Sequence, residues 1–345
     1  EEESDETEEG SVDEGELSQE EESFPTIADF QVPAFDALSN SSEGGETSPT
    51  EASQLDGASS EAHTASIRPI AFPMMFSANI AASNAEPGDT DDAIAGTPEA
   101  DTIFGWGGDD RIAAQAGDDE IHGNQDDDFI DAGSGNDITH GGKGDDQMMG
   151  GEGNDTLFGN LGDDTIAGNA HDDWINGNQG NDVIDGGEGD DEIYGGKDDD
   201  QIKGGDGKDT LSGNRGADQM EGNEGDDWLY GGQENDTLSG NAGNDVLHGD
   251  LGDDLLDGGE GADTLTGGEG RDRFFLVSGF GPDTIADFTK GEDLLVLDGG
   301  LTFADLTIAT VGDNTELRVG SEILARLAGI NSDMITQEDF TAFNV

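Results

Sequence analysis

The chain contains no cysteine among its 345 residues. Disulfide bonds and thiolate metal ligands are therefore excluded. Basic residues are also scarce, with 12 Lys and Arg against 83 Asp and Glu, which gives a formal net charge of −71. So little positive charge argues against nucleic acids and anionic membranes as partners. Without disulfides, bound metal is the obvious remaining source of stability for so acidic a chain.

Long apolar runs are absent as well. No stretch approaches the ~18 consecutive apolar residues of a membrane-spanning helix, so we expect no membrane span. The sequence shows no N-terminal secretion signal with a basic and then an apolar region. It begins at Glu1 rather than at Met, which leaves open whether the natural chain extends upstream.

Composition divides the chain into four parts. Residues 1–62 are acidic and Ser-rich and predict a disordered segment, because they cannot bury enough apolar surface to offset the entropy of ordering. Residues 63–95 hold an apolar patch and predict an N-terminal cap or linker, or a segment that binds a partner. Residues 96–275 are a repeat array. Residues 276–345 alternate short apolar strands with turns and predict a small C-terminal β cap, which a solenoid needs to cover its last turn.

The array repeats a nine-residue unit twenty times, without insertion or deletion. The unit reads G-G/N-x-G-D/N-D-x-aliphatic-x, as in residues 150–158. Position 8 is apolar in nineteen units, the exception being Thr139, and position 6 is Asp in all twenty. Positions 7–9 predict a three-residue strand with one inward side chain, and positions 1–6 predict a turn. Two units then form one circuit of 18 residues, so the array predicts an all-β fold, a parallel β-roll of two sheets.

The position 6 carboxylates predict a ladder of metal sites. Turns of alternate units stack, so these carboxylates and the carbonyls exposed by glycine line a gap suited to a hard cation with 6–8 oxygen ligands, and Ca²⁺ fits it better than Mg²⁺. Asx turns alone would accept Asn at position 6. The predicted aspartate ligands are Asp101, Asp110, Asp119, Asp128, Asp137, Asp146, Asp155, Asp164, Asp173, Asp182, Asp191, Asp200, Asp209, Asp218, Asp227, Asp236, Asp245, Asp254, Asp263 and Asp272. The predicted site glycines are Gly141, Gly142, Gly144, Gly150, Gly151, Gly153, Gly186, Gly187, Gly189, Gly258, Gly259 and Gly261.

This nonapeptide resembles that of the RTX (repeats-in-toxin, or hemolysin-type) calcium-binding proteins. Segments 283–288, 291–295 and 335–340 resemble the region that follows the repeats in serralysin-type proteins. The resemblance implies a secreted, extracellular protein, exported by type I secretion machinery that reads an uncleaved C-terminal signal. It also implies that the chain stays unfolded at low intracellular calcium and folds when calcium binds outside the cell.

Some units depart from the pattern. Position 1 is Ala rather than Gly at Ala114 and Ala132. Position 4 is not Gly in five units, and we expect altered or empty sites near them. These five residues are Glu99, Asp126, His171, Asp198 and Glu234.

The sequence offers little support for catalysis. None of the histidines lies in an H-E-x-x-H motif, no G-x-S-x-G elbow stands out, and residues 1–95 are too poor in apolar side chains for a catalytic domain. We therefore expect no enzyme activity, although the chain could be the non-catalytic part of a secreted hydrolase. Position 3 is never Thr, which argues against an ice-binding row.

Two outward features leave alternatives open. His122 and His140 should stack on neighbouring rungs, as a weak transition-metal site or as a solvated pair. Outward aromatics such as Trp174 and Trp228 are three circuits apart, so we interpret them as scattered surface residues. The alternative is an adhesin or surface-layer protein that uses the roll to contact a cell-surface polysaccharide.

Overall fold

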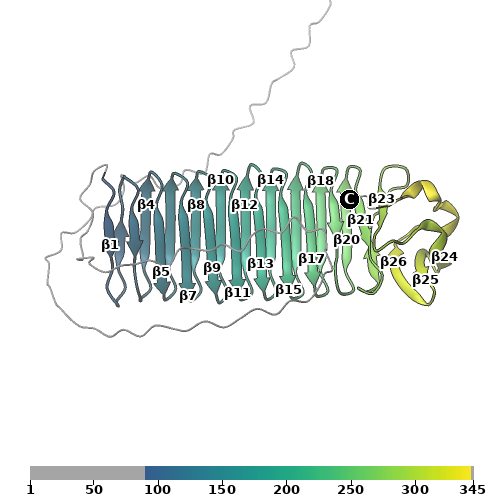
Figure 1. The fold of residues 1–345 in the computed structure, drawn as a ribbon, viewed down its shortest axis with the longest axis horizontal. Helices are drawn as coiled ribbons and strands as arrows, with labels where there is room; N and C mark the ends of the chain where they lie inside the picture. Colours follow the sequence, from purple (N-terminus) through teal and green to yellow (C-terminus); the bar gives the residue numbers. More distant parts are fainter. Residues whose placement is uncertain (1–89, 343–345) are drawn as a thin grey trace, which may run out of the picture. The chain divides into compact units, whose positions relative to one another are not determined.

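The computed structural model describes residues 90–342, which form a roll of two facing β-sheets (Figure 1). From β1 to β23, successive strands alternate between the sheets, so each strand pairs in parallel with the strand two places along the chain. The parallel β-roll expected from the repeat is therefore confirmed. The predictions for residues 1–62 and 63–89 lie outside the described residues.

The two sheets have 13 and 14 strands and are here named sheet A and sheet B. The strands of sheet A are β1 Ala93–Ala95, β3 Arg111–Ala113, β5 Phe129–Ser134, β7 Gln147–Glu152, β9 Thr165–Ala170, β11 Val183–Glu188, β13 Gln201–Asp206, β15 Gln219–Glu224, β17 Thr237–Ala242, β19 Leu255–Asp257, β21 Arg273–Leu276, β23 Leu294–Leu297 and β27 Phe340–Ala342. The strands of sheet B are β2 Thr102–Phe104, β4 Glu120–Gln125, β6 Ile138–Lys143, β8 Thr156–Leu161, β10 Trp174–Gln179, β12 Glu192–Lys197, β14 Thr210–Arg215, β16 Trp228–Gln233, β18 Val246–Leu251, β20 Thr264–Glu269, β22 Asp283–Ile285, β26 Glu322–Leu327, β25 Asn314–Val319 and β24 Leu306–Val311.

Most strands of the roll are longer than the repeat predicted. The expectation of three-residue strands at positions 7–9 was wrong, because β8 and most of its neighbours have six residues. Each of these continues through positions 1–3 of the next unit. The pairing of Asn160 and Leu161 with Gly142 and Lys143 shows that the backbone of positions 2 and 3 still joins the ladder of the adjacent rung. The turn proper is therefore confined to positions 4–6.

The core is a single column of position 8 side chains from each sheet. Residues such as Ile121, Leu157 and Ile175 are fully buried. Thr139 takes the same place with no exposed surface, and its hydroxyl has no hydrogen-bond partner. The nineteen apolar position 8 residues thus form the core as predicted. The hydroxyl of Thr139 is a buried polar group without a partner in that core.

The roll extends past both ends of the twenty repeats. β1 pairs with β3 and buries Ile94, so the first rung begins before the predicted boundary at residue 96. At the other end, β23 and β27 extend sheet A, and β22 and β26 extend sheet B.

Sheet B ends in an antiparallel meander of β24, β25 and β26, within residues 276–345, where the sequence predicted short strands and turns. Short 3₁₀ turns connect this region: η2 Phe303–Asp305, η3 Ser332–Met334 and η4 Gln337–Asp339. Glu316 forms ion pairs with Arg318 and Arg326 on the meander. In the described part of the chain, no helix is long and apolar enough to cross a membrane.

Candidate metal centre

The position 6 aspartates stack into a column along each edge of the roll, which we call the inner columns. Within a column, each Asp Oδ1 from Asp110 onward accepts the backbone N–H of the Asp 18 residues earlier, as Asp182 does from Asp164 at 2.8 Å. From Asp110 to Asp272, the nineteen position 6 side chains are at most 3% exposed. In every one of the nineteen, Oδ2 is buried and has no hydrogen-bond partner. Buried polar atoms almost always have partners, so this repeated exception indicates a missing ligand.

The orphaned oxygens face the glycine at position 1. A Cβ built on Gly159 would lie 2.3 Å from Asp164 Oδ2 and 2.8 Å from the carbonyl oxygen of Gly177 on the next rung. The same two kinds of oxygen approach Gly123, within 2.2 Å and 2.6 Å of its Cβ position. Because glycine has no side chain, a carboxylate oxygen and a carbonyl oxygen can approach the position 1 residue this closely, and the space between these two oxygens is here called a cradle.

Electrostatics in the inner columns favour a cation. Burial, followed by repulsion from neighbouring carboxylates, raises the pKa of Asp200 to about 9. The pKa of Asp146 and that of Asp164 rise to about 8 for the same reasons. A buried carboxylate avoids its charge unless a counter-charge is close. A positive ion in the cradle would supply that charge and restore the ionised form.

The donor set suits calcium. Across residues 90–342, no three His, Asp or Glu side chains converge on one metal position. An ion in a cradle would therefore combine carboxylate oxygens with backbone carbonyls. All of these are hard oxygen ligands, and Ca²⁺ accepts them in flexible geometry.

The predicted site glycines separate into two roles. Those at position 1, Gly141, Gly150, Gly186 and Gly258, border cradles, and a Cβ on any of them would lie within 2.4 Å of an Asp Oδ2. Those at positions 2 and 4 have positive φ, as in Gly151 at 114° and Gly153 at 130°. A Cβ at either of these two would collide with a carbonyl oxygen of the preceding rung, at 2.0 Å and 1.8 Å. Glycine at positions 2 and 4 therefore shapes the turn.

The units that depart from the repeat pattern do so at position 4 or at position 1. At position 4, Asp126, His171, Asp198 and Glu234 adopt positive φ of 69° to 81° and preserve the turn. The aspartates of these four units still have an orphaned Oδ2. At position 1, Ala114 and Ala132 carry a methyl group where the other units have glycine, yet the Oδ2 atoms of Asp119 and Asp137 are also buried without a partner.

The inner columns also continue beyond the repeats. Asp283 and Asp293 accept the backbone N–H groups of Asp263 and Asp272 at 3.3 and 3.1 Å. Their spacings of 20 and 21 residues hid them from a search for a nine-residue period. Asp293 Oδ2 accepts the N–H of Thr289 at 2.6 Å, so it is not orphaned.

The first predicted ligand is also satisfied within the chain. Asp101 Oδ2 accepts hydrogen bonds from the N–H and the hydroxyl of Thr97, at 2.6 and 2.9 Å. Among the twenty predicted aspartates, Asp101 is thus the one whose Oδ2 is not orphaned.

A second ladder runs outside the first. Position 5 side chains are exposed and accept the N–H of the position 5 residue 18 places later, as Asp127 does from Asp145 at 2.9 Å. We call these rows the outer columns. They include Asn136, which accepts from Asn154 at the same distance.

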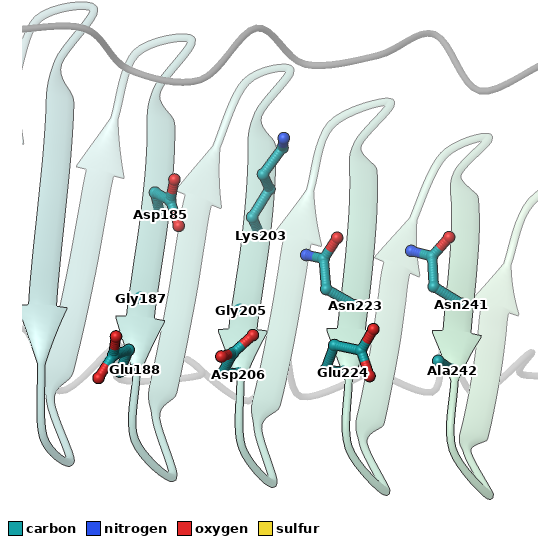
Figure 2. Close-up of a pocket in the computed structure, with 10 residues that line it drawn as sticks. All are labelled: Asp185, Gly187, Glu188, Lys203, Gly205, Asp206, Asn223, Glu224, Asn241 and Ala242. Carbon is teal, nitrogen blue, oxygen red and sulfur yellow. The ribbon is translucent and has the colours of Figure 1, made fainter. Parts of the chain in front are cut away.

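The two outer faces of the roll carry different side chains. Sheet A has a polar groove of about 510 Å³, in which Asp185, Lys203, Glu188 and Asp206 project from β11 and β13 (Figure 2). On sheet B, His122 and His140 stack on neighbouring rungs with ring centroids 4.9 Å apart, as expected. Phe104 and Phe158 stack on the two outer sides of this pair, and burial lowers the pKa of His140 to about 4. The interpretation of the sheet B aromatics as scattered was therefore wrong for Trp174, whose ring lies between those of Phe158 and Tyr194 at centroid distances of 5.1 and 5.7 Å.

Comparison with known proteins identifies the repeat. The chain matches the family described as RTX calcium-binding nonapeptide repeat in overlapping segments that run from residue 87 to residue 285. A search of curated proteins gave no match.

Three bacterial proteins of known structure are among those similar to this chain. The AlgE6R3 subunit of the Azotobacter vinelandii mannuronan C5-epimerase is 28% identical, over 35% of this chain and 80% of its own, with a TM-score of 0.30. The extracellular lipase LipA from Serratia marcescens is 19% identical, over 54% and 40%, with a TM-score of 0.28. A Ca²⁺-dependent β-helical antifreeze protein from an Antarctic bacterium is 17% identical, over 61% and 88%, with a TM-score of 0.30.

Proposed function

The chain belongs to the RTX calcium-binding nonapeptide repeat family, and we propose that its calcium binding serves to fold the roll outside the cell. The observation that supports this proposal is the set of nineteen buried Asp Oδ2 atoms without partners. Without a cation, the inner columns are rows of desolvated like charges. With calcium, the same atoms become ligands, so the free energy of binding becomes free energy of folding.

The place where the roll folds depends on the free calcium concentration. Extracellular calcium modules bind with dissociation constants of about 10⁻⁴–10⁻³ M, far above the free calcium inside a cell. The roll would stay unfolded during synthesis and fold after export. We propose export by a type I system, supported by the resemblance of the segments after the repeats to serralysin-type proteins. Residues 338–345 are the candidate signal, of which residues 343–345 lie outside the described part.

The chain's role in this proposal is structural and not catalytic. The conspicuous repeated feature is the cradle, which offers ligands but no nucleophile. The side chains in the sheet A groove, such as Asp185 and Lys203, belong to a shallow outer surface.

The test is a calcium titration of the full chain, followed by circular dichroism. We expect little strand signal in EDTA and a cooperative gain of strand in millimolar CaCl₂, which equal MgCl₂ does not reproduce. Equal strand content in EDTA and in calcium would refute calcium-dependent folding. Calorimetry in the same buffers reports binding separately, so a roll that binds calcium but is already folded would be recognised.

A further inference from the structure

The outer face of sheet B carries an unbroken column of rings. Adjacent ring centroids lie 4.6 to 5.7 Å apart. The column contains Trp106, Phe104, His122, His140, Phe158, Trp174 and Tyr194, in that order. A pair formed by Tyr230 and His248, 5.2 Å apart, follows farther along the same face.

The same face holds the exposed apolar side chains of the roll's strands. Among the described strands β1 to β21, the large apolar residues with high exposure are Ile138 (45%), Leu161 (40%), Trp228 (53%) and Leu251 (45%). All four belong to sheet B, on β6, β8, β16 and β18. Ile138 and Trp228 stand at position 7 and Leu161 and Leu251 at position 3, on either side of the rings at position 9. Together with the ring column, they make this the apolar face of the roll, and an exposed apolar face on an otherwise polar protein marks an interaction surface.

Charge is also depleted on this face. Strands β2 to β20 of sheet B hold four acidic residues, Glu120, Glu192, Asp250 and Glu269, against three basic residues, Lys143, Lys197 and Arg215. In a chain with a net charge of −71, this surface is therefore nearly neutral. Few charges and many aromatics are the composition of a protein–protein interface core.

We infer that the outer face of sheet B is a homodimer interface, on which a second copy of this chain docks through the same face. A second copy presents an equally uncharged surface, whereas other surfaces of the roll, such as the outer columns, would oppose it with carboxylates. Eight six-residue strands, β4 to β18, span roughly 700 Å² by strand spacing and length. This area is close to the ~800 Å² per partner of a stable protein interface.

Twofold symmetry fits the order of residues along each strand. A twofold axis parallel to the roll would place the ring columns of the two copies side by side, offset by about one residue along the strands. It would also place position 7 of each strand opposite position 3 of the same strand in the partner copy. On β12 these positions are Glu192 and Lys197, which are opposite in charge.

A polysaccharide is the weaker candidate for this face. Sugars pack on the open faces of aromatic rings, but from Phe104 to Phe158 the rings stack nearly parallel, with interplanar angles of 0° to 6°, so each covers the face of the next. This part of the column therefore presents outward a ridge of ring edges. Such a ridge suits the side chains of a facing sheet.

Cysteine cross-linking tests the interface, because the chain has no cysteine of its own. Ser212 on β14 and Ser239 on β17 occupy the same position of the repeat on sheet B and sheet A, and both are partly buried. In the calcium-loaded full chain, we expect Ser212→Cys to form a disulfide-linked dimer on mild oxidation, while Ser239→Cys remains monomeric. Similar cross-linking at both positions, or none at Ser212→Cys, would overturn the inference.

Sedimentation velocity provides the second measurement. We expect the unmodified chain in calcium to sediment as a dimer at tens of micromolar, and a Leu161→Lys, Trp228→Lys variant to sediment as a monomer with unchanged circular dichroism. The matched sheet A variant, Thr165→Lys, Gln219→Lys, should remain dimeric. If the unmodified chain sediments as a monomer, the interface is refuted. Binding of a soluble polysaccharide to this monomer, lost on substitution of Trp228, would assign the face to a sugar instead.

Discussion

The inner and outer columns contain the same kind of hydrogen bond but differ in which residues they accept. In both, an aspartate Oδ1 accepts a backbone N–H from a residue 18 places away. The outer column satisfies this ladder with Asn at several positions and interrupts it with Lys208 and Ala217. The inner column is Asp in all twenty repeats. Because the ladder itself accepts Asn, the invariant charge of the inner column must serve its other oxygen, the buried Oδ2 that lacks a partner.

The largest expected effect separates the two columns directly. We propose two triple variants that change neighbouring residues, with Asn retaining the Oδ1 acceptor in each. The inner variant is Asp146→Asn, Asp164→Asn, Asp200→Asn. The outer variant is Asp145→Asn, Asp163→Asn, Asp199→Asn.

The inner variant should need at least about 10-fold more calcium to fold, equivalent to ~1.4 kcal/mol. The outer variant should stay within about 0.5 kcal/mol per residue of the unmodified chain, as surface substitutions usually do. Calcium titration followed by circular dichroism measures both. Equal shifts in the two variants would show that overall negative charge, and not the cradle, sets the calcium requirement.

A smaller effect is expected from closing or opening a single cradle. In Gly159→Ala, the added methyl would lie beside Asp164 Oδ2 and the Gly177 carbonyl oxygen, so calcium binding at that turn should weaken. Ala132→Gly should have the opposite effect beside Asp137. Isothermal titration calorimetry should then report one calcium ion fewer or more per chain. If Gly159→Ala binds the full number of ions, the space at position 1 is not where calcium lies.

Much of this architecture is predictable from the sequence because the repeat has a fixed period. The apolar residue at position 8 predicts the core, and the invariant position 6 predicts the inner columns. The period also limits what can be recognised. Asp283 and Asp293 extend the columns at spacings of 20 and 21 residues, so no nine-residue count reaches them.

Other features depend on contacts between rungs, which the sequence of one unit does not contain. The six-residue strands arise because positions 1–3 pair with the adjacent rung. The ring column of sheet B joins Phe158 at position 9 to Trp174 at position 7 of a neighbouring strand, so it has no single repeat position. Counting by position therefore made these aromatics look scattered.

The smallest expected effect lies in the core, away from both columns. Thr139 is fully buried among apolar residues and its hydroxyl has no partner. Thr139→Val removes that hydroxyl and should stabilise the calcium-loaded roll by about 1 kcal/mol, since a buried unsatisfied polar group costs at least that much. Urea unfolding at saturating calcium measures the change.

The number of bound calcium ions should not change, because neither Asp137 nor Asp146 loses an atom. The variant therefore shows how far added stability alone moves the calcium midpoint, and the column variants must exceed that shift to count as ligand effects. If Thr139→Val destabilises the roll instead, the hydroxyl has a partner in solution and the core at this rung is hydrated.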